Sequence, residues 1–148
     1  MLNQILVGAA VSISNIAIHA FITTVVVHVA RRAAARTMSY PSLFLAGVMI
    51  GTVSVFMAAH SVEVLVWALA YTLVGAAPEG TNSVYFAFVN YTTLGYGDVV
   101  PVKEWQVLGP ITAMNGVLMF GWSTAVMFEV LRRTMSQQPQ PHGGAFET

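Results

Sequence analysis

Long apolar runs separated by short polar stretches organise this chain of 148 residues. Three predicted helices, at residues 2–30, 43–76 and 103–135, each exceed the roughly 20 residues that cross a hydrocarbon core about 30 Å thick. The run 43–76 contains no proline and no turn signal that would divide it, so we expect one long, tilted helix there. The pattern predicts an all-α membrane protein with three transmembrane helices.

A fourth apolar run, "TNSVYFAFVNYT" at residues 81–92, is too short to cross the membrane. At a rise of 1.5 Å per residue it covers only about 18 Å, and Thr81 or Asn82 can cap its start. A polar stretch follows it. Non-helical backbone at membrane depth is tolerated only where it is buried in protein or lines a water-filled cavity. We therefore predict a re-entrant helix followed by backbone that lines a cavity.

Composition agrees with a lipid bilayer as the surroundings of this chain. Hydrophobic residues make up 56% of it, charged residues only 8%, and the mean hydropathy is +0.70. A soluble domain carries about 25% charged residues, so this chain has too few charges to cover a soluble surface. The formal net charge is zero, which indicates no nucleic acid partner. The absence of cysteine excludes disulfides and thiolate metal sites.

Arginines mark the two ends of the predicted spans. One group lies at residues 31–36 and another at residues 132–133. The two groups lie on the same side of the membrane if the helix at residues 43–76 crosses once and residues 77–102 enter the membrane and return to the same face. By the positive-inside rule that side is cytoplasmic. We expect an integral membrane protein with a cytoplasmic C-terminus, and the compact chain favours a bacterial inner membrane.

The stretch "YTTLGYGDVVP", residues 91–101, gathers small and polar residues within an otherwise apolar chain. Gly95 and Gly97 are spaced by two and accept positive φ, which lets successive carbonyl groups turn toward one axis. In this membrane setting "TTLGYGD", Thr92 to Asp98, resembles the selectivity-filter signature of potassium channels. In that filter, backbone carbonyls replace the hydration shell of the ion.

The resemblance implies K⁺ as the permeant ion, with no other metal and no cofactor. Dehydrated K⁺ would be coordinated by the backbone carbonyls of Thr93, Leu94, Gly95 and Tyr96. The hydroxyl of Thr93 would add a further ligand. The residues that would support this filter are Thr92, Gly97 and Asp98. Because each chain carries one copy of the filter and a ring needs four, the resemblance implies a homotetramer.

Residues 37–135 resemble a two-helix pore unit as a whole. Its parts would be the outer helix 43–76, the pore helix 81–92, the filter 93–97 and the inner helix 103–135. Residues 1–36 then form an extra N-terminal transmembrane helix with a basic cytoplasmic loop. The Pro- and Gly-containing residues 136–148 are predicted to be a disordered cytoplasmic tail. We expect no soluble regulatory domain.

Three residues behind the filter depart from the family pattern. Leu94 replaces the commoner Val or Ile, and Val89 stands where some bacterial channels carry a glutamate that pairs with the filter aspartate. Phe86 lacks the indole donor often found there. We therefore expect Asp98 to lack two usual partners and the filter to be less firmly braced.

Two ionisable residues, His60 and Glu63, lie on one face of the second predicted helix. An ionisable residue within a membrane helix is costly and suggests a function. Glu63 lies 13 residues, about 20 Å, below the expected helix end. Equal depth on the inner helix predicts a hydrogen bond from this pair to Trp122, Ser123 or Thr124. The pair is either a clasp between helices or a gating or proton-sensing element.

Other polar and small residues allow more than one interpretation. Gly116 and Gly121 are candidate hinges of the inner helix, with plain close packing as the alternative. His19 and His28 lie about 180° apart around their helix, so they cannot share a metal ion within one chain.

The sequence therefore predicts a potassium-selective channel that conducts K⁺ passively and is not an enzyme. A weakly selective monovalent cation channel is the nearest alternative. A proton-coupled transporter that uses His60 and Glu63, and a non-transporting anchor or subunit, are the alternatives from other classes.

Overall fold

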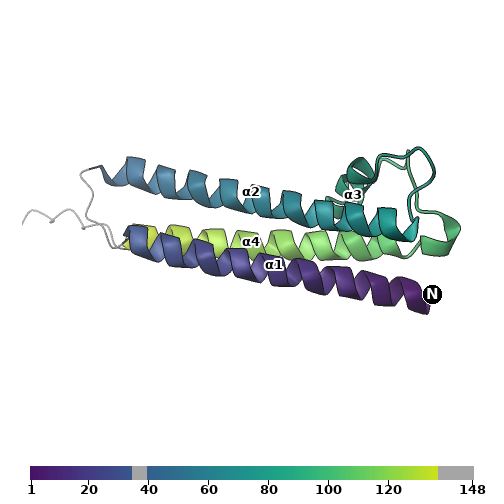
Figure 1. Ribbon diagram of the computed structural model, residues 1–148. Coiled ribbons are helices and arrows are strands. Elements are labelled where there is room, and N and C mark those ends of the chain that lie inside the picture. Colours follow the sequence, from purple (N-terminus) through teal and green to yellow (C-terminus); the bar gives the residue numbers. More distant parts are fainter. Residues whose placement is uncertain (35–39, 137–148) are drawn as a thin grey trace, which may run out of the picture.

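The computed structural model describes residues 1–34 and 40–136. Within them the chain forms four α-helices, one short 3₁₀ helix and no β-strand. In chain order these are α1 (Leu2–Ala34), α2 (Pro41–Val74), α3 (Ser83–Tyr91), η1 (Lys103–Trp105) and α4 (Leu108–Ser136). Figure 1 shows α1, α2 and α4 as three long neighbouring rods, with α3 and its loops gathered at the end where the N-terminus lies.

The three long helices are each apolar and long enough to cross a membrane, so the three long apolar helices that the sequence predicts are present. The expected single helix over 43–76 is α2, a continuous helix of 34 residues. Large apolar side chains along all three rods are exposed, as lipid-facing positions are; examples are Phe21, Ile50 and Phe128. A bundle in water would have to bury such side chains.

The short helix α3 begins and ends within its expected range. The side chain of Asn82 caps its start and accepts hydrogen bonds from the backbone N–H groups of Val84 and Tyr85, at 3.0 and 3.1 Å. Asn82, rather than Thr81, is therefore the cap. At 9 residues α3 is about 14 Å long, far less than a bilayer needs.

Two helix ends differ from the sequence-based ranges for local reasons. Helix α2 ends at Val74 because Gly75 adopts a left-handed conformation with φ of 66°, which terminates the helix. Helix α4 begins at Leu108 rather than 103, and Lys103–Trp105 form the separate turn η1. Pro110 lacks an N–H and suits only the first turn of a helix, so a start at 103 would place it in the interior.

Helix α1 packs closely along α4. A Cβ at Gly8 would lie only 2.7 Å from the Ile111 side chain, so the glycine permits this approach. The buried Gln4 side chain accepts a hydrogen bond of 2.9 Å from the backbone N–H of Val107, just before α4 begins. The extra N-terminal helix thus supports the start of the fourth helix.

Arginines from the first and last long helices meet at the other end of the bundle. Arg31 and Arg133 line the same small hollow between α1 and α4, beside Glu129. Glu129 pairs with Arg132 at 2.9 Å and with Arg133. The two basic groups therefore share one end, as the sequence predicts, although Arg36 and the tail from 137 onward lie outside the described residues.

Candidate functional site

The stretch after α3 has a backbone that is neither helix nor strand. Positive φ recurs at every second residue: 58° at Thr93, 59° at Gly95 and 78° at Gly97. Threonine is uncommon in this region of φ, so the local structure must hold Thr93 there. The backbone N–H of Leu94 supplies one such contact, donating to the carbonyl of Val89 at 3.0 Å.

Every residue of this stretch, from Thr92 to Asp98, is exposed in the single chain. The large side chains of Leu94 and Tyr96 are 52% and 68% exposed, whereas Tyr91, directly before the stretch, is fully buried. Within the described part of the chain, helices therefore hold the stretch from one side only. Its other surface is free to face water or further protein.

Asp98 has a hydrogen-bonding partner that the sequence argument missed. The Tyr85 hydroxyl donates to Asp98 Oδ2 at 2.6 Å. The expectation that Asp98 lacks two usual partners concerned positions 86 and 89, where Phe86 and Val89 are buried; Tyr85 precedes Phe86, points to the exposed side of α3 and supplies a different partner. The hydrogen bond to the carboxylate raises the pKa of the Tyr85 phenol above its ordinary 10.0.

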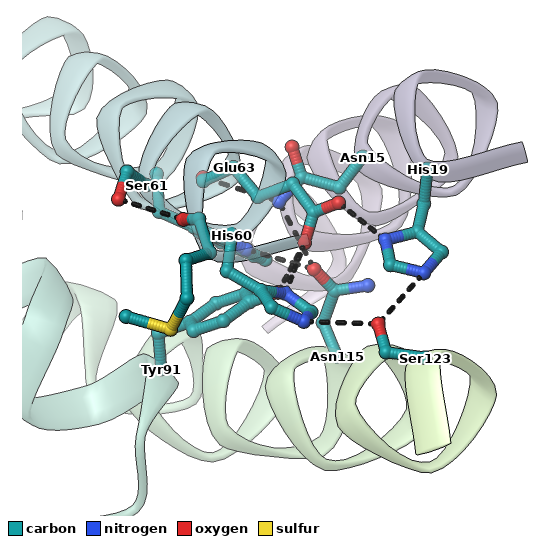
Figure 2. Close-up of polar contacts among 10 residues, drawn as sticks. Asn15, His19, His60, Ser61, Glu63, Tyr91, Asn115 and Ser123 are labelled. Atoms are coloured by element: carbon teal, nitrogen blue, oxygen red, sulfur yellow. Dashed lines mark hydrogen bonds and ion pairs between the residues drawn. The ribbon is translucent and has the colours of Figure 1, made fainter. Parts of the chain in front are cut away.

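Behind the stretch, three helices converge on one buried carboxylate, that of Glu63. It accepts hydrogen bonds from the Tyr91 hydroxyl at the end of α3 and pairs with His19 Nδ1 of α1 at 2.7 Å. His60 Nδ1, one turn away on α2, lies 3.2 Å from the other carboxylate oxygen. Figure 2 shows these side chains pointing toward one another between the helices.

The fourth helix joins the same cluster through one serine. Ser123 Oγ lies 3.0 Å from His60 Nε2 and 3.2 Å from His19 Nε2. The predicted hydrogen bond from the His60 and Glu63 pair to residues 122–124 is thereby confirmed. His19 was missed as a member because the sequence argument compared it only with His28, which is exposed on another face of α1.

A second set of buried amide contacts extends the cluster. Asn115 Oδ1 accepts hydrogen bonds from Asn15 Nδ2 at 3.1 Å and from Trp67 Nε1 at 3.0 Å. Asn15 Nδ2 also reaches the backbone carbonyl of Glu63 at 3.2 Å. The sequence contains a signal that α1 contributes to the buried cluster, since Asn15 and His19 are four residues apart and share a helix face.

The two candidate hinge glycines have different surroundings. A Cβ at Gly116 would lie 1.9 Å from the backbone carbonyl oxygen of Tyr91, so this glycine lets the end of α3 rest against α4. Gly121 is exposed, and a Cβ there would meet nothing within 4 Å. The contact favours close packing at Gly116, and hinge motion at either glycine stays a prediction.

Comparison with known protein families gives one match. A family model described as "Ion channel" matches residues 59–133, just over half of the chain. The chain therefore belongs to this ion-channel family and is an integral membrane protein. The matched region runs from the middle of α2 to near the end of α4 and includes His60, Glu63 and the whole stretch from Thr92 to Asp98.

The other two comparisons add no relative. No curated protein and no solved structure matches the chain. Helix α1 lies outside the region that the ion-channel model matches, although it contributes His19 and Asn15 to the buried cluster.

Proposed function

We propose that this chain is a potassium-selective channel that conducts K⁺ passively down its gradient. The observation that carries the proposal is the sequence TTLGYGD, in a member of an ion-channel family, with positive φ at alternate residues directly after a short helix. Alternating backbone of this kind suits carbonyls that turn toward a common axis. The proposed coordinating residues are Thr93, Leu94, Gly95 and Tyr96, supported by Thr92, Gly97 and Asp98.

The proposed active form is a homotetramer. The exposed stretch with its 52% exposed Leu94 is a surface that other copies would cover. One chain provides one copy of the filter, and four copies arranged around an axis would enclose a dehydrated ion. Helix α3 is too short to cross the membrane, so it would enter from one face, and the stretch after it would return to that same face.

The proposed orientation follows from the charges. Arg31, Arg32, Arg132 and Arg133 are exposed at one end of the bundle, opposite the stretch from Thr92 to Asp98. By the positive-inside rule this end, with the C-terminus, would be cytoplasmic. The filter would then open to the other side.

Reversal potentials of the purified chain in planar bilayers test the function. A potassium-selective channel gives unitary currents whose reversal potential moves by about 59 mV for each tenfold change in the K⁺ gradient. The reversal potential stays unchanged when the Na⁺ concentration is varied on one side. Reversal near zero under opposed K⁺ and Na⁺ solutions would instead identify a weakly selective cation channel. Saturable, proton-dependent uptake without unitary currents would identify a transporter.

A further inference from the structure

The buried cluster brings together a set of atoms that bind metal ions. One ligand atom each from His19, His60 and Glu63 can be chosen so that all three lie within 4.8 Å of one another. His19 and Glu63 are fully buried, and the His60 side chain is only 13% exposed. Two imidazoles with one carboxylate form a ligand set that Zn²⁺ uses in proteins, with the fourth position left open.

The ring orientations favour a cation between these groups. Both histidines direct Nδ1 toward the Glu63 carboxylate and Nε2 toward the single Ser123 hydroxyl. The four contacts need four protons if Glu63 is ionised, and the serine supplies one. Two neutral imidazoles carry only two. The arrangement is therefore short of one positive charge.

A divalent metal at the Nδ1 side would replace the two contacts with Glu63 by coordination and leave the two contacts with Ser123 as hydrogen bonds, with both rings neutral. Each histidine then keeps its proton on Nε2 and donates it to Ser123 Oγ, which has two lone pairs. A hydrogen bond from the remote ring nitrogen is the usual support of a metal-bound histidine. One serine would thus orient both ligands.

The distances are compatible with a small rearrangement. Tetrahedral Zn²⁺ with bonds of 2.0–2.1 Å separates its ligand atoms by about 3.3 Å. Nδ1 of His19 lies 2.7 Å from Glu63 Oε1, and Nδ1 of His60 lies 3.2 Å from Glu63 Oε2. One ligand atom from each of the three residues can be chosen with no separation above 4.8 Å. The Tyr91 hydroxyl contacts both His60, at 3.1 Å, and Glu63, so it lies next to the fourth position.

We propose that His19, His60 and Glu63 form a binding site for a divalent transition metal of the Zn²⁺ class. The site would tie the extra helix α1 to α2 directly beside Tyr91, the last residue before the stretch Thr92–Asp98. Nitrogen donors select against Mg²⁺ and Ca²⁺, which take oxygen ligands. The inference does not depend on potassium conduction, because the site is complete within one chain.

Metal content and Co²⁺ absorption of the purified full chain test this site. The chain has 4 histidines, so the double variant His28→Ala/His142→Ala retains only His19 and His60. Without cysteine, no thiolate competes for the ion. We expect this double variant to bind one Zn²⁺ per chain, and Co²⁺ to give the intense visible bands of a tetrahedral site. Chelation should lower its melting temperature, since an ion bound only to the folded state stabilises it.

Variants of the cluster, made in that double-variant background, separate this site from adventitious binding. His19→Gln, His60→Gln and Glu63→Gln should each weaken Zn²⁺ binding by at least about 100-fold, and Ser123→Ala by about 10- to 100-fold with the Co²⁺ bands retained. Because Ser123 is not a ligand and alanine is small, this variant remains informative if a ligand variant misfolds. Absence of stoichiometric binding, or equal binding in the double variant and its Ser123→Ala derivative, would overturn the proposal.

Discussion

Two polar regions of this chain lie next to each other and differ in how far one chain completes them. The stretch from Thr92 to Asp98 is exposed along its whole length, and Tyr85 donates a hydrogen bond to Asp98 at its end. The cluster around Glu63 is buried, and four helices supply its hydrogen bonds, with Asn15 Oδ1 left as an unpaired acceptor. A single chain leaves the first region exposed and encloses the second.

Tyr91 connects the two regions. Its hydroxyl belongs to the buried cluster, its carbonyl rests against Gly116, and its backbone continues into Thr92. Tyr91 therefore offers a direct path from the cluster to the stretch. The comparison predicts that variants in the stretch alter conduction without unfolding the chain, whereas variants in the cluster alter stability first.

The largest effect is expected at Gly95. Its φ of 59° is a conformation that side chains with Cβ adopt only at a cost of about 1–3 kcal/mol. In Gly95→Ala that cost would distort the proposed carbonyl ladder, and we expect loss of the K⁺ current with the assembly intact by size-exclusion chromatography. Gly80→Ala is the matched control, since Gly80 has a φ of 76° but lies in the loop before α3. Normal currents in Gly95→Ala would contradict the filter assignment.

Gly116→Ala is expected to be the most destabilising single change. The new Cβ would lie 1.9 Å from the Tyr91 carbonyl oxygen, so α3 and α4 must move apart. Overpacking of this kind costs about 1–3 kcal/mol, and a backbone clash belongs at the upper end. Thermal melting in detergent measures the effect.

Gly121→Ala sharpens the meaning of that result, because its Cβ would meet nothing within 4 Å in the single chain. We expect the melting temperature of Gly121→Ala to stay close to that of the unmodified chain. If both glycine variants melt alike, close packing on Tyr91 does not explain why Gly116 is a glycine.

The sequence was sufficient for the elements of this fold but not for their lateral contacts. Apolar length identified the three long helices, and Asn82 and the short run behind it identified α3. Gly75 and Pro110 indicate where α2 ends and where α4 begins, which the length of the apolar runs does not. All of these are properties of neighbouring residues, which a sequence displays directly.

Contacts between helices depend on rotation and vertical offset, which the sequence does not display. Depth counting along the helices was enough to bring the pair of His60 and Glu63 to residues 122–124, of which Ser123 contacts His60. It gave no reason to bring His19 to Glu63, because the position of α1 around the bundle was unknown. Tyr85 was missed as a partner of Asp98 because the family pattern directed attention to Phe86 and Val89.

A smaller loss of stability is expected from Asn115→Ala within the buried cluster. Its Oδ1 accepts hydrogen bonds from Asn15 and Trp67. Without it the buried Trp67 N–H would lose its acceptor, whereas Asn15 Nδ2 would keep its contact with the Glu63 carbonyl. Unsatisfied buried donors cost about 1–3 kcal/mol, so we expect a lower melting temperature in detergent. Thr124→Ala is the control, because its hydroxyl bonds only within α4 and is exposed. Equal melting of the two variants would show that the amide contacts do not stabilise the bundle.

The smallest effect is expected from Tyr85→Phe, which changes the partner of Asp98 in the exposed stretch. The variant removes the hydroxyl that donates to Asp98 but leaves the backbone of the stretch in place. Open times of single channels should therefore shorten while the reversal potential stays the same. Tyr40→Phe, which removes an exposed hydroxyl at the opposite end of α2, should leave both unchanged.

The pH dependence of the open times tests whether the bond from Tyr85 to Asp98 causes the difference between the unmodified chain and Tyr85→Phe. Because the pKa of the Tyr85 phenol is raised above 10.0 in the folded chain, the bond to Asp98 is fully present below pH 10 and is lost only as pH rises through the higher folded value. Open times of the unmodified chain and of Tyr85→Phe should thus differ at neutral pH and still differ at pH 10. If they already coincide at neutral pH, the hydroxyl does not brace Asp98.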